Sequence, residues 1–367
     1  MIALRVAAEA DLAGEILVAR LVISKRSDRQ SQYGLDYRFE RQIDNWSEFV
    51  REGLRIRLEA SAQDLDGDVI LLAPRAQSAH RLIRAKSHHN SLLITEQCDQ
   101  LCVMCSQPPK PHHVDLFAAF LRACLVSPQN TVIGVTGGEP LLHKDQLFAL
   151  LKEVHSERPD IRFHVLTNGQ HFTCEDISIL NEQAFRNVLW AIPFYAPNPS
   201  VHDHIVGKPG AFERLLETFE ILSRTTAQIE LRTVVMRSNN PLLAQLADFL
   251  TTHIPFASCW SIMQMERIGY GRMNWDQEFL DTSVDFEEIA RSLCIAHTRG
   301  LEARLFNFPL CTVPKPYRRF AVASISDWKM KFEKFCIGCS LRSRCGGFFK
   351  WHDQKSGYAR IGMNEEA

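Results

Sequence analysis

The segment NSLLITEQCDQLCVMCSQPPK, residues 90–110, places Cys98, Cys102 and Cys105 in the spacing C-x3-C-x2-C, directly after a short apolar run. Thiolates bind zinc or iron, and a structural zinc ion takes four ligands in a closed tetrahedral site. A four-iron cluster needs a terminal ligand on each iron, so three cysteines leave one iron open to a reactant. The spacing therefore favours an iron–sulfur site with one open position over a structural zinc site.

Apolar runs of strand length alternate with amphipathic helical patterns from residue 91 to about residue 270. For example, Leu147, Leu150, Leu151 and Val154 follow the i, i+3, i+4, i+7 spacing of a helix. Strand–helix units in series imply right-handed crossovers and a parallel sheet with helices outside. The pattern predicts an α/β fold, either a partial (β/α)6 barrel or a doubly wound sheet, with the active site at the carboxyl ends of the strands. The predicted strands are 92–95, 131–136, 163–167, 188–194, 229–235 and 259–265.

The flanking regions differ from this alternating core. Residues 1–88 contain one clear strand, GDVILLAP at 67–74, and a basic stretch around Arg75, Arg81, Arg84 and Lys86. We expect a small N-terminal domain at 1–88, a partial barrel at 89–275 and a C-terminal extension at 276–367. The basic stretch suits an acidic peptide leader, which the small domain could also bind by strand addition, or it is a solvated surface strip.

Composition narrows the class of protein. The chain has 367 residues, of which 46% are hydrophobic and 23% charged, and a formal net charge of −1, so nothing indicates a nucleic-acid partner. No run of about 18 apolar residues predicts a membrane span, and the first residues lack a signal-peptide pattern. We expect a cytoplasmic protein with reduced thiols. Seven of its eleven cysteines fall into two groups; Cys124, Cys174, Cys259 and Cys294 stand alone, and packing explains them best.

The segment TGGEP, residues 136–140, ends the second predicted strand. With the cysteine triplet one strand earlier, it resembles the radical S-adenosylmethionine (SAM) superfamily. The resemblance implies a [4Fe–4S] cluster on the three cysteines, whose open iron chelates SAM, and reductive cleavage to a 5′-deoxyadenosyl radical. Gly137 and Gly138 would let backbone approach the ligand, Glu139 would hold its ammonium group, and Pro140 completes the motif. Met104 takes the place of the usual aromatic residue beside the adenine.

Other cofactor contacts are less sharply specified by the resemblance. Thr167 and Asn168 in LTNG are candidate polar contacts, although an Asn-Gly turn explains them equally well. Arg232 would pair with the methionine carboxylate or form a surface salt bridge. Pro193 stands where many relatives carry a serine that contacts the cofactor.

Two further positions stay open between structural and functional roles. Glu266 is a substrate ligand or a helix-start acid. His202 and Asp203 position a loop or face the substrate. No residue is assigned as a hydrogen donor or acceptor in catalysis.

A second cysteine group lies near the C-terminus. Cys311, Cys336, Cys339 and Cys345 supply four thiolates, enough to close a site, and their spacing alone does not distinguish zinc from iron–sulfur. Beside the first group they resemble the auxiliary-cluster extension, of the SPASM or twitch type, of peptide-modifying radical SAM enzymes. That resemblance implies an auxiliary [4Fe–4S] cluster that supports the protein or transfers electrons.

Several short segments are more specific still: HNSLLITEQC, CVMCSQPPK, HDHIVGKPGAF, NFPLC, SISDWK and CGGFF. Together they resemble the His-Xaa-Ser system radical SAM maturases of the C type. The resemblance implies modification of a precursor peptide or small protein, a second radical SAM maturase as partner, and an electron donor such as flavodoxin or ferredoxin. Two alternatives remain: a radical SAM enzyme acting on a small molecule or nucleobase, and a non-catalytic iron–sulfur redox protein.

Overall fold

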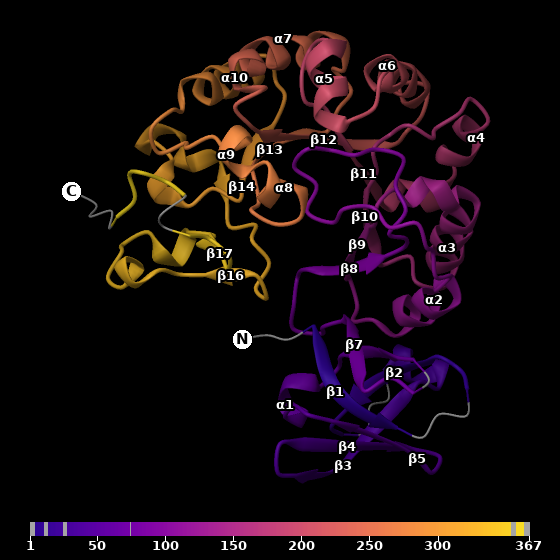
Figure 1. Cartoon of the computed structure of the whole chain (residues 1–367). Coiled ribbons are helices and arrows are strands. Elements are labelled where there is room, and N and C mark those ends of the chain that lie inside the picture. The colour runs from indigo at the N-terminus through magenta and orange to yellow at the C-terminus, as the bar shows by residue number, and fades with distance from the viewer. Residues whose placement is uncertain (1–3, 11–13, 25–27, 74, 354–356, 363–367) are drawn as a thin grey trace.

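The computed structural model describes residues 4–10, 14–24, 28–73, 75–353 and 357–362. The chain begins with a closed seven-stranded barrel in the order β1-β5-β4-β3-β2-β6-β7 (Figure 1). The barrel is built from β1 (Arg5–Ala10), β2 (Leu17–Val22), β3 (Asp36–Ile43), β4 (Trp46–Arg51), β5 (Leu54–Leu58), β6 (Val69–Leu72) and β7 (Ser78–Ile83), with α1 (Ala62–Leu65) before β6. Sequence analysis found only one clear strand here. The others are short and rich in charge, and most of β3 is exposed, so their pattern resembles that of loops.

The closed barrel bears on both expectations about peptide binding. Closure pairs every strand on both sides, which leaves no free edge for strand addition among the described strands of the barrel. The basic stretch is divided: Arg75 and Lys86 are exposed, whereas Arg81 and Arg84 are only 5% and 4% exposed. Arg81 bonds Asp64 and Asp68 at 3.0 and 2.5 Å. These two arginines are therefore not available to an acidic leader.

The second assembly is a sheet of eight parallel strands in the order β15-β14-β13-β12-β11-β10-β9-β8. The predicted parallel α/β arrangement is confirmed, and all six predicted strands are present. Two more strands extend the sheet beyond residue 275, so it has eight strands where six were expected. Its strands are β8 (Asn90–Leu93), β9 (Val132–Thr136), β10 (Arg162–Leu166), β11 (Val188–Pro193), β12 (Gln228–Val235), β13 (Cys259–Gln264), β14 (Ala303–Phe306) and β15 (Ala321–Val322).

Helices cover the outer face of this sheet in an arc (Figure 1). On β12, Ile229, Leu231 and Val235 are buried in the same core as Leu246 and Leu250 of α7, while the alternate residues face the other way. The helices are α2 (Phe117–Val126), α3 (Lys144–Glu157), α4 (Asp176–Leu180), α5 (Pro199–Val206), α6 (Ala211–Leu222), α7 (Leu243–His253) and α10 (Glu287–Thr298). Among the described residues, no helix is long and apolar enough to cross a membrane.

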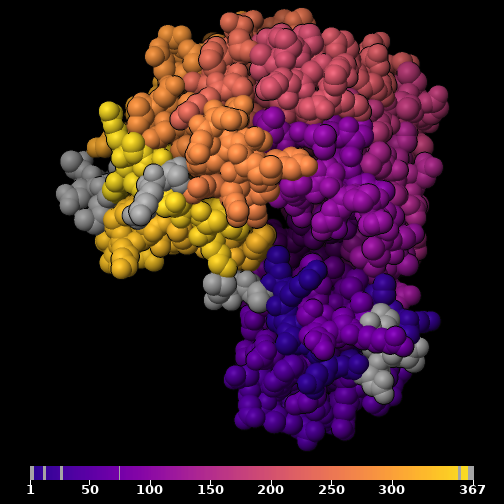
Figure 2. Space-filling model, in the orientation of Figure 1, coloured from indigo at the N-terminus to yellow at the C-terminus, as the bar shows by residue number. Residues whose placement is uncertain are grey.

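The remaining elements lie at the carboxyl side of β13 and in the C-terminal segment. They are α8 (Tyr270–Met273), α9 (Trp275–Glu278) and a small antiparallel pair, β16 (Met330–Lys331) and β17 (Phe348–Phe349). In the space-filling view, the C-terminal segment and the N-terminal barrel flank a recess below the α8–α9 segment (Figure 2). The N-terminal barrel shares core with the rest of the chain, since Val18, Val69 and Ile83 belong to the same apolar cluster as Phe120 of α2.

Candidate functional site

The three cysteines of the first group lie on a loop that leaves the carboxyl end of β8, as predicted from their position after an apolar run. The turn after the neighbouring strand β9 holds the start of this loop. Gly138 and Glu139 donate backbone hydrogen bonds to the carbonyl oxygens of Thr95 and Gln97 at 2.8 and 2.7 Å. A Cβ on Gly137 would lie 2.6 Å from the Thr95 carbonyl oxygen, and one on Gly138 only 2.1 Å from that of Gln97. In the structure, the two glycines thus make room for the backbone of the cysteine loop.

The far side of the loop is held by two other elements. Leu101 and Val103 donate backbone hydrogen bonds to Val206 and Ile205 at the end of α5, at 3.0 and 2.9 Å. After β13, Tyr270 donates its N–H to the Cys105 carbonyl at 2.8 Å. A Cβ on the preceding Gly269 would lie 2.5 Å from that same carbonyl oxygen. The segment after β13 therefore packs its Gly269 against the cysteine loop.

Glu139, Thr167 and Asn168, which follow the strands β9 and β10, are brought together in the structure. Glu139 is fully buried; its Oε1 accepts hydrogen bonds from the Thr167 hydroxyl and the Leu141 N–H at 2.6 and 2.8 Å, and its Oε2 from the Asn168 N–H at 2.5 Å. Burial raises the pKa of Glu139. Its carboxylate joins the ends of β9 and β10 and caps the short 3-10 helix that Pro140 begins. The position expected to hold an ammonium group thus already has three donors.

Asp99, inside the cysteine spacing, is the centre of a network that sequence analysis missed. Its carboxylate accepts from the Asn168 side-chain amide at 2.7 Å, bonds Lys208, and lies 3.3 Å from His171. Burial opposes ionisation, but these partners outweigh it and hold the pKa of Asp99 well below its usual range. A lone Asp between cysteines carries no sequence signal, because its partners are 69 to 109 residues away.

The chemistry of the thiols fits a metal cluster. Burial raises the pKa of Cys98 to about 11, helped by the negative charges of Glu139 and Asp99, and it also raises the pKa of Cys102 and Cys105. Thiolates are the ligand form of cysteine, and at these buried positions they need a nearby positive charge. Metal ions supply that charge. The residues of the first group therefore suit a cluster with thiolate ligands.

Met104 lies between the second and third cysteine ligands and is 8% exposed. It packs in an apolar cluster with Tyr195, Met236 and Met265, which lie at or beyond the carboxyl ends of β11, β12 and β13. This placement keeps Met104 at the carboxyl side of the sheet, where the sequence resemblance puts the adenine.

Arg232 projects from β12, on the face opposite the helices. Its guanidinium bonds Glu230 at 3.2 Å, and Glu230 also bonds His164 across the sheet. Burial would raise the pKa of Glu230, but Arg232 and His164 lower it to about 2. Of the two expectations for Arg232, the structure contains the salt bridge, although its partner Glu230 is buried rather than exposed.

His202 and Asp203 both lie in α5 and occupy structural positions there. His202 is 1% exposed and its Nδ1 accepts the Tyr195 N–H at 3.3 Å. Asp203 accepts the N–H groups of Gly210 and Phe212 at 2.6 and 2.8 Å. Both contacts favour the loop-positioning role. Since α5 holds the cysteine loop through Ile205 and Val206, these residues act on that loop indirectly.

The four cysteines of the second group line one small cavity of about 20 Å³. Burial and the neighbouring thiols raise the pKa of Cys311 to about 12 and also raise that of Cys336. Cys345 is held by N–H donors from Leu310 and Gly347, each 3.4 Å from its sulfur. Among the described residues, no three His, Cys, Asp or Glu side chains gather closely enough to bind a single metal ion. Four thiols around one cavity could hold either a zinc ion or an iron–sulfur cluster.

The C-terminal segment contacts the carboxyl side of the sheet through Glu266, just beyond β13. Lys329 bonds the Glu266 carboxylate at 3.1 and 3.3 Å, and burial raises the pKa of Glu266. Glu266 is thus not a helix-start acid; it pairs with a lysine that sequence analysis did not consider.

Residues 92–250 match the family model described as the radical SAM superfamily. The AdoMet-dependent heme synthase of Oleidesulfovibrio alaskensis is 24% identical over 53% of this chain and 50% of that relative. The GTP 3′,8-cyclase of Nautilia profundicola is 26% identical over 42% of this chain and 50% of that relative. The chain thus matches about half the length of these curated relatives.

Among solved structures, the Streptococcus suis protein SuiB bound to S-adenosylmethionine superimposes with a TM-score of 0.50. The alignment has 13% identity and covers 67% of this chain and 53% of SuiB. At this identity the likeness shows the fold alone. Together with the family model, it identifies a radical SAM α/β fold around the first cysteine group.

Proposed function

Starting from a radical SAM domain at residues 92–250, we propose that this chain reductively cleaves S-adenosylmethionine and uses the resulting radical to modify a precursor peptide or small protein. The observation that carries the first part is the loop of Cys98, Cys102 and Cys105 at the carboxyl end of β8, clamped by the GGEP turn. Three thiolates on a rigid loop suit a [4Fe–4S] cluster with one open iron.

The bound cluster would supply the electron that breaks a sulfur–carbon bond of S-adenosylmethionine. The chain's own residues position the loop. Gly137 and Gly138 let the turn after β9 pack closely against the cysteine loop. Backbone hydrogen bonds to α5 hold the middle of the loop, and the hydrogen bond between Asp99 and Asn168 links the loop to the end of β10. Met104 and its apolar neighbours exclude water beside it. Because Glu139 is already bonded to three donors, we propose that it holds the Thr167–Asn168 segment in place rather than a ligand.

For the second cysteine group we propose an auxiliary [4Fe–4S] cluster bound by Cys311, Cys336, Cys339 and Cys345. The match of residues 92–250 to the radical SAM superfamily supports a cluster over a zinc ion here, because the four thiols accompany a first cysteine group of that type. Four thiolates leave no open iron, so this site suits electron transfer or structural support.

A peptide substrate, of the His-Xaa-Ser type with a second maturase as partner, is supported by the combined sequence segments and by the position of the second cysteine group. Met104 of the first cysteine loop and Cys336 of the second group belong to one apolar cluster. A substrate between the two groups would therefore reach both. A peptide leader would not bind by adding a strand to the N-terminal barrel, since the described strands of this closed barrel have no free edge.

Anaerobic reconstitution followed by iron and sulfide analysis tests this proposal. Two cubane clusters predict roughly eight irons per chain. Replacing Cys98, Cys102 and Cys105 together by alanine is expected to remove about four irons and abolish 5′-deoxyadenosine formation. Cys174→Ala is the matched control, because that cysteine is exposed and lies outside both groups. Full iron content in the triple variant, or stoichiometric zinc in anaerobically purified protein, would contradict the proposed pair of clusters.

A further inference from the structure

The face of the parallel sheet opposite the helices, here called the inner face, is only partly covered. On β10, Phe163 and Val165 are buried on the helix side, whereas His164 between them points the other way and is half-buried. On β9, Gly134 is likewise half-buried between two buried neighbours. Polar groups on this part of the inner face are therefore within reach of a substrate.

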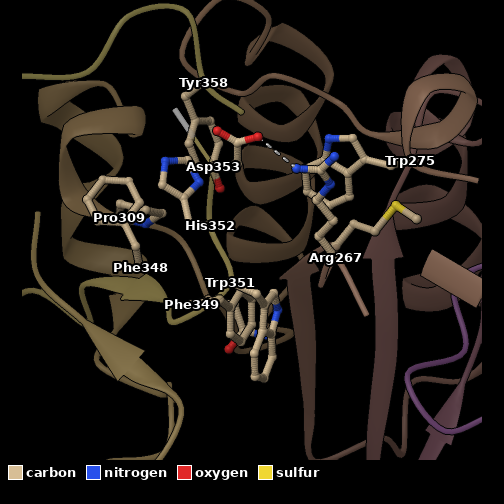
Figure 3. Close-up of a pocket in the computed structure, with 11 residues that line it drawn as sticks. Arg267, Trp275, Pro309, Phe348, Phe349, Trp351, His352, Asp353 and Tyr358 are labelled. Atoms are coloured by element: carbon tan, nitrogen blue, oxygen red, sulfur yellow. Dashed lines mark hydrogen bonds and ion pairs between the residues drawn. The ribbon is translucent and has the colours of Figure 1, made fainter. Parts of the chain in front are cut away.

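The carboxyl ends of β13 and β14, by contrast, are closed by packing against the C-terminal segment (Figure 3). Trp275, Phe348 and Tyr358 belong to one apolar cluster there, and Arg267 bonds Asp353 at 3.3 Å. These side chains and their neighbours leave a cavity of only about 20 Å³, which admits a water but no side chain. The accessible inner face is thus that of β9 to β12.

A carboxylate and an imidazole meet on this face. Nε2 of His164, in β10, bonds Glu230, in β12, although β11 lies between the two strands. Neighbouring strands are about 4.8 Å apart, so the two side chains together bridge roughly 10 Å. Ala191 of β11 is in register with Glu230, and its small side chain leaves room for this contact.

The charge of Glu230 fixes which nitrogen of His164 is free. Glu230 is buried, and burial would raise its pKa, but Arg232 and His164 lower this pKa to about 2. An ionised carboxylate only accepts hydrogen bonds, so Nε2 of His164 carries the hydrogen between them. Within the described part of the chain Nδ1 has no hydrogen-bond partner, and the His164 side chain is 29% exposed. The Nδ1 lone pair is therefore open to the inner face.

The pair lies below the first cysteine loop. Arg232, two residues nearer the carboxyl end of β12 than Glu230, bonds that carboxylate at 3.2 Å. His164 is three residues before Thr167, which is roughly 10 Å along a strand. Thr167 bonds Glu139 of the turn that holds the cysteine loop. A substrate group between these two levels would have the cysteine loop on one side and Nδ1 of His164 on the other.

We propose that His164 is a catalytic base for the peptide substrate and that Glu230 is its positioning residue. The inference rests on the proposed peptide modification and adds the group that takes up a proton. Loss of a hydrogen atom from a substrate carbon makes an N–H, O–H or S–H group on that carbon more acidic. This bond breaks with its electron pair left on the heteroatom, and the proton adds to Nδ1 of His164. The Glu230 carboxylate balances the charge of the imidazolium that forms.

Turnover of a synthetic peptide with His-Xaa-Ser repeats by the reconstituted full-length protein, followed by mass spectrometry, tests the inference. His164→Gln keeps a polar side chain beside Glu230 but cannot take up a proton. It is expected to slow peptide modification about 100-fold, while 5′-deoxyadenosine still forms. His253→Gln, at an exposed position at the end of α7, is the matched control and should leave both rates unchanged. Modification by the His164 variant at the wild-type rate overturns the inference.

Chemical rescue separates a base from a structural histidine. His164→Ala leaves a space beside Glu230, and added imidazole is expected to restore modification about tenfold in this variant. Pyrazole has the same shape and is a far weaker base, so it should not restore the rate. Equal effects of imidazole and pyrazole, or no effect of either, overturn the assignment of His164.

Glu230 is tested through its dependence on His164. Glu230→Gln is expected to slow modification at least about tenfold, but to have no further effect in the His164→Gln protein, because it acts through that ring. Independent losses that add up in the double variant would give Glu230 a separate structural role. Absence of modified peptide in the wild-type protein would overturn the proposed function and this assignment together, whereas wild-type rates in the His164 variants overturn the assignment alone.

Discussion

The guanidinium of Arg84 makes two hydrogen bonds to the carboxylate of Asp327, at 2.5 and 2.9 Å, across 243 residues of sequence. Arg84 follows the last strand of the N-terminal barrel and is itself tied to Asn90 at the start of β8. Asp327 lies five residues after β15, the other edge of the eight-stranded sheet. The pair therefore links the segments that flank the two edges of an open sheet.

Breaking this link is expected to destabilise the protein. Arg84 is 4% exposed and Asp327 34%. Arg84→Met should therefore lower the free energy of unfolding by about 2 kcal/mol, which is less than the loss for a fully buried ion pair. Asp327→Asn should cost less, and the double variant less than the sum of the two. Urea unfolding of all four proteins measures the coupling. Additive losses would mean that the two side chains do not interact in solution.

Gly138→Ala tests whether the GGEP glycines serve the cysteine loop. An added Cβ would meet the Gln97 carbonyl oxygen and the Cys98 Cβ at 2.1 and 2.9 Å, so the loop must move. We expect loss of about half the reconstituted iron, since only the first group is affected. Gly300→Ala is the control: it strains a positive φ of 81° but meets no atom within 4 Å. Equal iron content in both variants would contradict this role.

His202 gives a pH prediction. Burial lowers its pKa to about 4 from an ordinary 6.5, so the folded protein holds it neutral while the unfolded chain takes up a proton below pH 6.5. Stability is thus full above pH 6.5 and falls as the pH drops towards 4. By linkage, this one group removes about 2 kcal/mol between pH 7.5 and pH 5.

The comparison that isolates His202 is His202→Phe, which keeps a ring among Phe194 and Phe212 and does not titrate. Urea midpoints at pH 7.5 and pH 5 should differ less in this variant than in the wild type. His88→Gln, at an exposed position, should keep the wild-type dependence. The same pH dependence in all three proteins would show that His202 has the same pKa in the folded and the unfolded state.

Sequence patterns predicted the parallel sheet and its helices well because their determinants are local. Each of the six predicted strands buries apolar residues, so an apolar run marks it, and motif residues at strand ends share one edge of the sheet. Glu139, Thr167 and Asn168 meet there for that reason. The partners of Asp99 and Arg84 lie far away in the sequence, so no local pattern predicts these contacts. Most strands of the N-terminal barrel were missed because they are short or, like β3, largely exposed, so no apolar run marks them.

We expect the second cysteine group to serve substrate modification and not the cleavage of S-adenosylmethionine. Its four thiols leave no open position for S-adenosylmethionine, so Cys345→Ala should still form 5′-deoxyadenosine with a strong chemical reductant. Cys345 sulfur accepts two backbone N–H groups, and its removal should cost about four of roughly eight irons. Modification of the precursor peptide should fail in the same protein. Cys294→Ala, at an exposed position outside both groups, should keep both activities. A Cys345 variant that cannot form 5′-deoxyadenosine, although its first cluster is intact by electron paramagnetic resonance, would mean that the second group takes part in initiation.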